Sequence, residues 1–210
     1  LGISANLFLN SIYRLPILMY HSIDYTSDKS NRMMVSPDVF ERQMAVLRRG
    51  GYNVIPLGKA VRYIKERRRP PAKTVAITLD DGYKNNYVYA YPILKKYRIP
   101  ATIFVVVKMV GIEGFMSWDD LKELDSSGLI DIESHTMSHT WLRDADDARL
   151  KQELAGSKSL LEERLGKIVN FSESSGGYPY PMGYGMGGDM VRTLEAKATP
   201  DVPAGENTYT

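Results

Sequence analysis

Short apolar runs alternate with amphipathic stretches along most of the chain. The runs, which are of strand type, lie at 16–20, 52–56, 74–79, 101–107 and 129–133. The stretches between them carry apolar residues at helical spacing, at 37–49, 58–67, 86–97, 118–126 and 146–165. Strands that read as continuous apolar runs between helices are typical of a parallel sheet or barrel that is buried on both faces. The pattern therefore predicts an α/β fold.

Local signals place the ends of several elements. Ser36 followed by Pro37 is typical of a helix start, and Gly50-Gly51 of a helix end. The segment 69–71 (RPP) breaks the pattern before the third strand, and 168–171 is a weaker candidate for a sixth strand. We find no internal repeat and no linker, so we expect one domain.

Polar side chains follow the first, third and fifth predicted strands. His21 follows the first strand, Asp80 and Asp81 close the third, and His135 closes the fifth. In parallel α/β folds, reactive groups gather at the carboxyl ends of the strands. We therefore expect these four residues on one rim of the sheet.

Composition and charge exclude only a few classes of protein. With 210 residues, 43% hydrophobic and 25% charged, the chain has the composition of a globular protein, and a net charge of +2 gives no argument for nucleic acid. The basic run 62–73 is typical of a solvated helix end and loop; the alternative is a surface for an anionic polymer or membrane. The absence of cysteine excludes disulfides, thiolate metal sites and a cysteine nucleophile.

Membrane and targeting signals are weak. No apolar stretch approaches the roughly 20 residues that span a bilayer. The first residue is Leu rather than Met, which is consistent with removal of an upstream signal or anchor.

The three histidines and two adjacent aspartates carry the candidate chemistry. His135 and His139 are four apart, which would place both imidazoles on one side of a helical turn, although such pairs also occur by chance. Asp80-Asp81-Gly82 is equally compatible with a simple acidic turn. Taken together, Asp81, His135 and His139 would form a three-ligand metal site with an open position for water, as in metal-dependent hydrolases. The adjacent Asp80 would remain free to act as a base.

Two motifs match a known family. Residues 79–82 (LDDG) resemble its T-F-D-D-G motif, and 135–139 (HTMSH) resemble the H-[ST]-x-x-H motif of polysaccharide deacetylases, the NodB-homology domain of carbohydrate esterase family 4. The resemblance extends over about 16–184 and includes 91–106 (YPILKKYRIPATIFVV) and 117–124 (SWDDLKEL). Because the only other histidine, His21, comes first, the chain looks like the circularly permuted subgroup that deacetylates poly-N-acetylglucosamine in biofilms.

The resemblance implies a fold and a metal. The fold would be an irregular, TIM-like (β/α) barrel of about seven parallel strands, in a single domain over 1–210 with its core at about 16–195. Asp81, His135 and His139 would bind a divalent ion. Imidazole and carboxylate ligands suit zinc best, while cobalt, nickel and iron are also compatible.

The resemblance also implies catalytic roles. Asp80 would be the general base that takes a proton from the metal-bound water. His21 would be the acid that protonates the leaving amine, the alternative being a structural role. The backbone N–H of Tyr180 would bind the oxyanion, unless the loop 172–188 is only a flexible lid.

Two further departures from the family pattern stand out. Gly177 occupies the position where many members have an Arg that orients the base. The segment 196–210 does not read as the strand that usually follows. Trp118 is expected to be a packing residue, while Trp141, two residues after His139, would be placed to stack on a sugar ring.

The function implied is hydrolysis of N-acetyl groups from N-acetylglucosamine residues of a polysaccharide, such as a biofilm glucan, peptidoglycan or a chitin-like chain. The alternatives are an O-acetyl ester hydrolase acting on a polymer such as xylan, and a carbohydrate-binding pseudoenzyme. The resemblance further implies an extracellular or cell-envelope location. It leaves the oligomeric state open.

Overall fold

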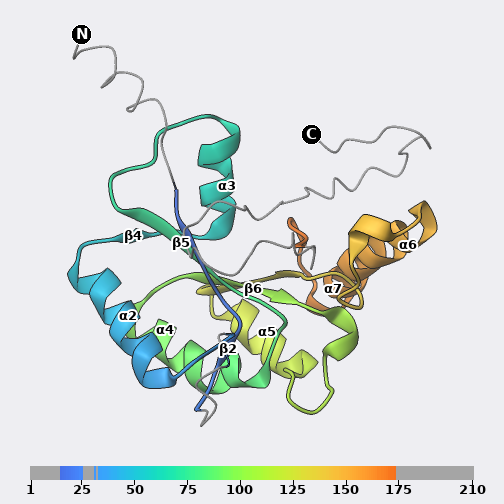
Figure 1. Ribbon diagram of the computed structural model, residues 1–210, viewed down its shortest axis with the longest axis horizontal. Helices are drawn as coiled ribbons and strands as arrows, with labels where there is room; N and C mark the ends of the chain where they lie inside the picture. Colours follow the sequence, from blue (N-terminus) through green and yellow to red (C-terminus); the bar gives the residue numbers. More distant parts are fainter. Residues whose placement is uncertain (1–14, 26–30, 32, 174–210) are drawn as a thin grey trace.

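A parallel sheet forms the centre of the fold in the computed structural model, which describes residues 15–25, 31 and 33–173 (Figure 1). Its strand order is β1-β5-β6-β7, and β4 pairs in parallel with the first two residues of β5. The strands are β1 (Ile17–Tyr20), β4 (Asn53–Val54), β5 (Thr74–Leu79), β6 (Ala101–Val105) and β7 (Ile130–Ser134). The predicted α/β class with a parallel sheet is confirmed.

The helices fall where the amphipathic stretches predicted them. They are α2 (Pro37–Arg49), α3 (Leu57–Lys65), α4 (Tyr91–Tyr97), α5 (Trp118–Ser126), α6 (Asp147–Lys151) and α7 (Ser157–Leu165). Two turns are π-helical, at Asn86–Ala90 before α4 and at Gln152–Gly156 between α6 and α7. The expected start of α2 is also observed, since the side chain of Ser36 accepts the N–H of Val39 at 3.4 Å.

Short elements escaped the sequence pattern. β2 (Ser22–Ile23) and β3 (Met34–Val35) pair as a separate parallel ribbon, and single 3₁₀ turns form at Val107–Met109 and Leu142–Asp144. Elements of two or three residues have no measurable periodicity.

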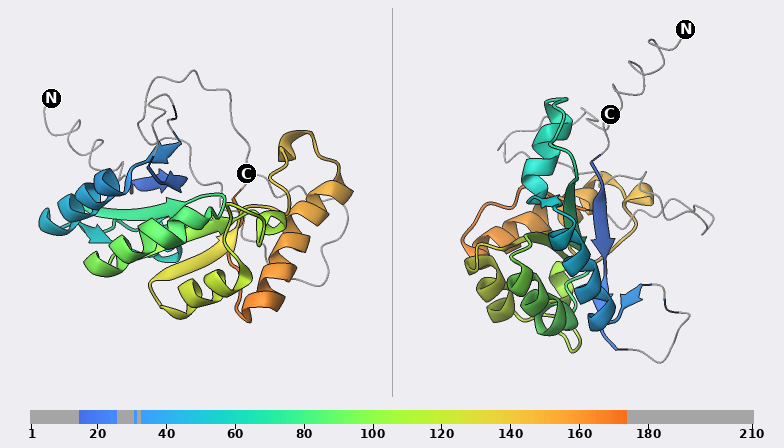
Figure 2. Two further views of the ribbon diagram at one scale, coloured as in Figure 1. Left: turned by 90° about the horizontal axis from the view of Figure 1, so that it is seen from below. Right: turned by 90° about the vertical axis from the view of Figure 1, so that its left-hand side faces the viewer.

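Alternation along the strands divides the core between the two faces of the sheet. Val75, Ile77 and Leu79 belong to the larger apolar cluster, which α2, α4, α5 and α7 cover from one side (Figure 2). Ala76 and Phe104 belong to a smaller cluster on the other face, against α3. Both faces of the central strands are therefore buried, as their continuous apolar sequence predicted.

The strand register brings the polar strand ends together. Tyr20 lies opposite Leu79, and Val105 lies opposite Ser134. The residues that follow these strands, His21, Asp80 and His135, therefore emerge at the same edge of the sheet.

The described residues do not close this sheet into a barrel. The predicted sixth strand, 168–171, is not a strand among the described residues; one isolated bridge with β7 follows it, between Ser172 and Ser134. Gly177, Tyr180 and the segment 196–210 lie outside the described residues. Within the described part of the chain, no helix is long and apolar enough to cross a membrane.

The basic run is exposed. Arg62 and Lys65 lie on the last turn of α3, and Arg67, Arg68 and Arg69 follow in the loop. This placement fits a solvated helix end and loop, and binding of an anionic partner stays a prediction.

Candidate metal centre

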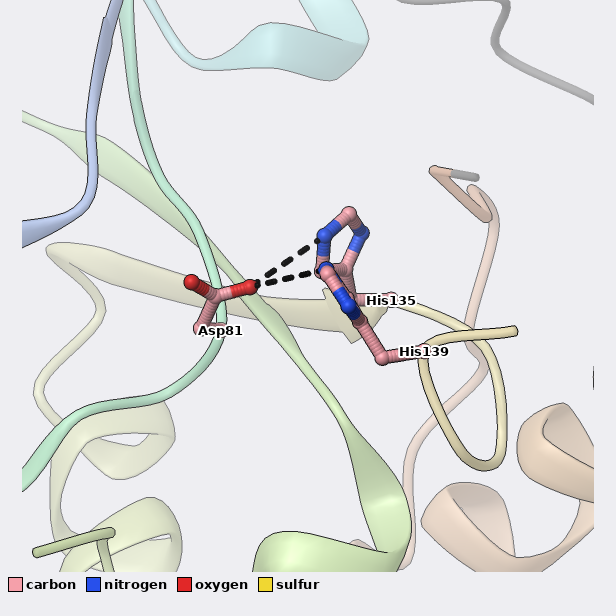
Figure 3. Close-up of side chains that lie close together, drawn as sticks. All are labelled: Asp81, His135 and His139. Atoms are coloured by element: carbon pink, nitrogen blue, oxygen red, sulfur yellow. Dashed lines mark ion pairs between the residues drawn. The ribbon is translucent and has the colours of Figure 1, made fainter. Parts of the chain in front are cut away.

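Three side chains converge at the carboxyl end of the sheet. Oδ1 of Asp81 lies 3.4 Å from Nε2 of His135 and 3.3 Å from Nε2 of His139 (Figure 3). All three atoms lie within 4.8 Å of one another. The structure thus brings together the three residues that the sequence proposed as ligands.

The donor set fits a divalent ion. Atoms bound to one tetrahedral zinc at about 2.0–2.2 Å stand roughly 3.3–3.5 Å apart, close to the two distances observed. Oδ1 of Asp81 is buried and has no hydrogen-bond partner among the described residues, which is costly unless a cation lies beside it. Burial by itself would raise the pKa of Asp81, but His135 and His139 lower it overall, so the carboxyl group is ionised.

Left-handed backbone conformations at Asp81 and Gly82 direct the Asp81 side chain toward the two histidines. Asp81 has φ 72° and Gly82 has φ 81°, so the chain bends sharply as it leaves β5. At Gly82 a Cβ atom would meet the side chain of Val105 at 3.3 Å. Glycine at this position therefore serves both the turn and the close approach to β6.

The turn that carries the two histidines is not helical. Thr136 has φ 68° and His139 has φ 59°, both left-handed, and Oγ1 of Thr136 accepts the N–H of His139 at 3.0 Å. The expectation of a helical turn is therefore wrong, because this side-chain bond closes a tighter turn instead. The four-residue spacing still brings the two imidazole rings to a centroid distance of 4.9 Å.

A backbone carbonyl fixes the orientation of His135. Nδ1 of this ring lies 3.2 Å from the carbonyl oxygen of Glu173. Since a carbonyl oxygen only accepts hydrogen bonds, Nδ1 is the donor in this contact, and Nε2 is the nitrogen that faces Asp81. Such an outer partner is typical of metal-binding histidines.

Asp80 and His21 lie beside the three candidate ligands. Oδ2 of Asp80 is 3.9 Å from Nε2 of His21, and Asp80 is only 2% exposed. Burial raises the pKa of Asp80 well above its ordinary value, and the neighbouring carboxyl group of Glu173 adds to this. Burial lowers the pKa of His21, against the opposing charge of Asp81. The amide of Asn86 holds the backbone of His21 through a 2.9 Å bond to its carbonyl oxygen.

Glu173 was not identified from the sequence. It lies at the start of a Ser- and Gly-rich stretch without periodicity, so nothing local distinguishes it. In the structure its carboxyl group is buried beside Asp80, and its pKa is raised, mainly by burial. The base candidate thus faces a second buried carboxyl group.

The two tryptophans differ as expected. Trp118 is half-buried against the main core, with the guanidinium of Arg164 over its ring at 5.7 Å. Trp141 is 56% exposed. A role for Trp141 in stacking on a sugar stays a prediction.

Comparison with known proteins now decides the family. The sequence model described as "Polysaccharide deacetylase" matches residues 67–186, more than half of the chain. The chain belongs to the polysaccharide deacetylase family. The resemblance in its motifs is thereby confirmed.

Two curated relatives of this deacetylase-family chain are similar over most of its length. One is the putative polysaccharide deacetylase YxkH of Bacillus subtilis, 39% identical over 149 residues, 71% of this chain and 52% of the relative. Another is the poly-beta-1,6-N-acetyl-D-glucosamine N-deacetylase of Staphylococcus aureus, 32% identical over 168 residues, 74% of this chain and 56% of the relative. The chain thus spans about half the length of these relatives.

Solved structures of deacetylases share the fold. The Streptococcus pyogenes deacetylase PplD, in complex with acetate, is 28% identical with a TM-score of 0.71, covering 77% of this chain and 73% of its own. IcaB from Ammonifex degensii is 31% identical with a TM-score of 0.70, covering 80% and 76%. These likenesses confirm the α/β fold with a parallel sheet.

Proposed function

We propose that the protein is a metal-dependent N-deacetylase that acts on N-acetylglucosamine residues of a polysaccharide. The observation that carries this proposal is the convergence of Asp81, His135 and His139 on one point, with Asp80 and His21 beside it. The substrate class is supported by the relative in S. aureus, whose name specifies poly-beta-1,6-N-acetyl-D-glucosamine. Because such polymers lie outside the cell membrane, we also propose a cell-envelope or extracellular location.

The chain's own residues supply the proton transfers. A divalent ion held by the three ligands, with zinc the best suited, would polarise the acetyl carbonyl group and lower the pKa of the attacking water. Asp80 then accepts the proton of that water. Burial raises the pKa of Asp80, which makes its carboxylate a stronger proton acceptor.

His21 is proposed as the acid that protonates the leaving amine. Its Nε2 lies 3.9 Å from Oδ2 of Asp80, so the proposed acid and the proposed base lie side by side at the same edge of the sheet.

An O-acetyl ester substrate is the second candidate, because an alkoxide leaving group needs less acid assistance than an amine. The substitution His21→Ala separates the two. For an N-acetyl substrate it should lower kcat by roughly 10²- to 10⁴-fold, the usual contribution of a general acid. Unchanged acetate release after this substitution would favour the ester.

The decisive experiment measures acetate release from N-acetylglucosamine oligomers together with bound metal. We expect the zinc-loaded protein to release acetate, a chelator to abolish the release, and His135→Ala to lose both metal and activity. Metal-loaded protein that releases no acetate from any such oligomer would overturn the proposal. Tight sugar binding that is indifferent to chelators would instead support a pseudoenzyme.

A further inference from the structure

The proposed ligand His139 sits on an exposed turn rather than on a strand. Its side chain is 45% exposed, whereas that of His135 is 5% exposed. Its backbone is left-handed, a conformation that is uncommon for residues other than glycine. Such a turn keeps one geometry only when its surroundings hold it.

Glu153 holds the two residues that precede His139. Its Oε2 accepts the N–H of Ser138 at 2.8 Å, and its Oε1 accepts the hydroxyl of Ser138 at 2.6 Å. Its backbone carbonyl accepts the N–H of Met137 at 3.0 Å. The Glu153 side chain is fully buried, so these bonds are protected from water.

Arg149 extends the contacts to the residue after His139. One guanidinium nitrogen lies 3.0 Å from Oε1 of Glu153 and donates to the hydroxyls of Ser138 at 3.1 Å and Thr140 at 2.8 Å. Both neighbours of His139 are therefore tied to the same helical segment.

The segment that carries Glu153 has an unusual backbone. Glu153 lies in the π-helical turn Gln152–Gly156, between α6 and α7. π-Helical turns inside α-helices are frequent at functional sites. Here the turn places a charged side chain, with no exposure to solvent, directly against the candidate metal-binding turn.

We propose that Glu153 is a positioning residue that, together with Arg149, fixes the turn of His139 in the geometry that binds the metal. This inference rests on the proposed metal site. In Glu153→Gln one of the two acceptor oxygens becomes an NH₂ group, so one of the contacts to Ser138 is lost together with the charge that pairs with Arg149, and the turn is released. The consequence is weaker metal binding, because His139 must then be ordered when the metal binds.

Asp120 offers a matched control. It accepts the N–H of Ser117 at 2.7 Å and its hydroxyl at 2.8 Å, and it pairs with Lys84 at 2.7 Å. The chemistry is that of Glu153, a carboxylate bound to a serine and a cation. Asp120 supports the start of α5, which carries none of the three proposed ligands.

The test measures zinc affinity by competition with a chromophoric chelator, the visible spectrum of the cobalt-loaded protein, and thermal unfolding without metal. We expect Glu153→Gln to weaken zinc binding by roughly 10- to 100-fold, which is typical when an outer partner of a metal ligand is removed. The cobalt spectrum should also change. Asp120→Asn should leave affinity and spectrum unchanged. At saturating zinc, Glu153→Gln should recover acetate release. If Glu153 took part in the chemical step, saturating zinc would not restore acetate release.

Arg149→Met, at a side chain 41% exposed, gives a second route if Glu153→Gln does not fold. We expect it to weaken zinc binding by a smaller factor with little change in stability. Zinc binding by folded Glu153→Gln or Arg149→Met equal to that of the native chain would overturn the inference alone. An equal loss in Asp120→Asn would do the same. Failure of the native chain to bind metal would overturn the proposed function as well.

Discussion

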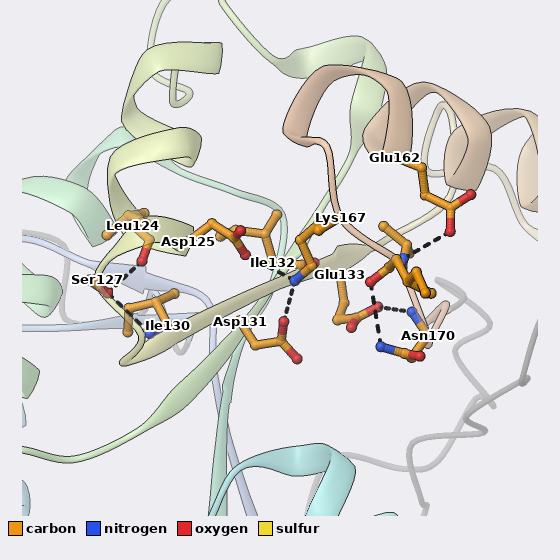
Figure 4. Close-up of polar contacts among 12 residues, drawn as sticks. Leu124, Asp125, Ser127, Ile130, Asp131, Ile132, Glu133, Glu162, Lys167 and Asn170 are labelled. Carbon is orange, nitrogen blue, oxygen red and sulfur yellow. Dashed lines mark hydrogen bonds and ion pairs between the residues drawn. The ribbon is translucent and has the colours of Figure 1, made fainter.

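The buried carboxyl group of Glu133 should make the stability of the protein depend on pH. Glu133 lies on β7, beside the segment that leads to Glu173 (Figure 4). Its Oε2 accepts the N–H groups of Asn170 and Phe171, both at 2.8 Å, while its Oε1 has no partner among the described residues. Burial, with a further contribution from Asp131, raises its pKa to about 8. The folded protein therefore keeps this carboxyl group largely protonated at neutral pH.

The pKa of Glu133 differs between the folded and the unfolded chain, and this difference sets how the free energy of unfolding changes with pH. The pKa is about 8 in the folded chain and near the ordinary 4.5 in the unfolded chain, so the folded state binds the proton more tightly. The resulting stability is fully present below pH 4.5 and is lost as the pH rises through 8. The difference corresponds to at most about 5 kcal/mol, at 1.36 kcal/mol for each pH unit.

Glu133→Gln tests the reasoning, since glutamine keeps an oxygen that can accept both N–H groups and cannot ionise. Urea unfolding of both proteins, at about pH 5 and about pH 8.5, gives the free energy of unfolding. We expect the native chain to lose more stability than the variant between about pH 5 and about pH 8.5, by roughly 2–4 kcal/mol. Glu162→Gln is the control. Because the pKa of Glu162 is lowered rather than raised, this substitution should not reduce the loss of stability between about pH 5 and about pH 8.5. Parallel losses in the native chain and Glu133→Gln would refute the reasoning.

Three further predictions concern the turn, the core and the metal. Gly82→Ala should destabilise the protein by about 1–2 kcal/mol and weaken zinc binding, because Gly82 has a positive φ and an added Cβ would press on Val105. Thermal unfolding and zinc competition measure the two effects, and unchanged values would contradict the prediction. Leu121→Ala, at a fully buried position, should cost about 2–5 kcal/mol in urea unfolding, whereas Val46→Ala, at a residue 63% exposed, should cost under about 0.5 kcal/mol; equal costs would contradict the packing. Zinc at 100 times its Kd should add about 2.7 kcal/mol to the free energy of unfolding, and a chelator should remove this gain; the absence of any change would count against a specific site.

Much of the fold could be predicted because its signals are local. The run 74–79 is apolar and is followed by an acidic turn, and β5 ends at Leu79 as expected. Ser36, Pro37 and Gly50 mark the ends of α2 within the sequence itself. The π-helical turns escaped prediction because a single extra residue hardly disturbs the apolar spacing.

The candidate site was predictable only where it follows strand ends. His21, Asp80, Asp81 and His135 come directly after predicted strands, so the parallel sheet places them on one rim. The conformation of His139 was not predictable, because a side-chain bond, rather than helical spacing, closes its turn.

The outer partners of the site could not be predicted at all. Glu153 and Glu173 lie 14 and 34 residues after His139 in the sequence. Their contacts arise only when the π-helical turn packs against the turn that follows β7 and the segment after α7 runs beside the end of β7. Neither residue belongs to a motif that the spacing of the sequence reveals.

In the proposed site, Asp80 serves as the base beside a metal that Asp81, His135 and His139 hold. The most direct test compares Asp80→Asn with the native chain, measuring zinc content and acetate release from N-acetylglucosamine oligomers. We expect Asp80→Asn to keep its zinc while acetate release falls by roughly 10²- to 10⁴-fold. Native rates of acetate release in zinc-loaded Asp80→Asn would contradict it.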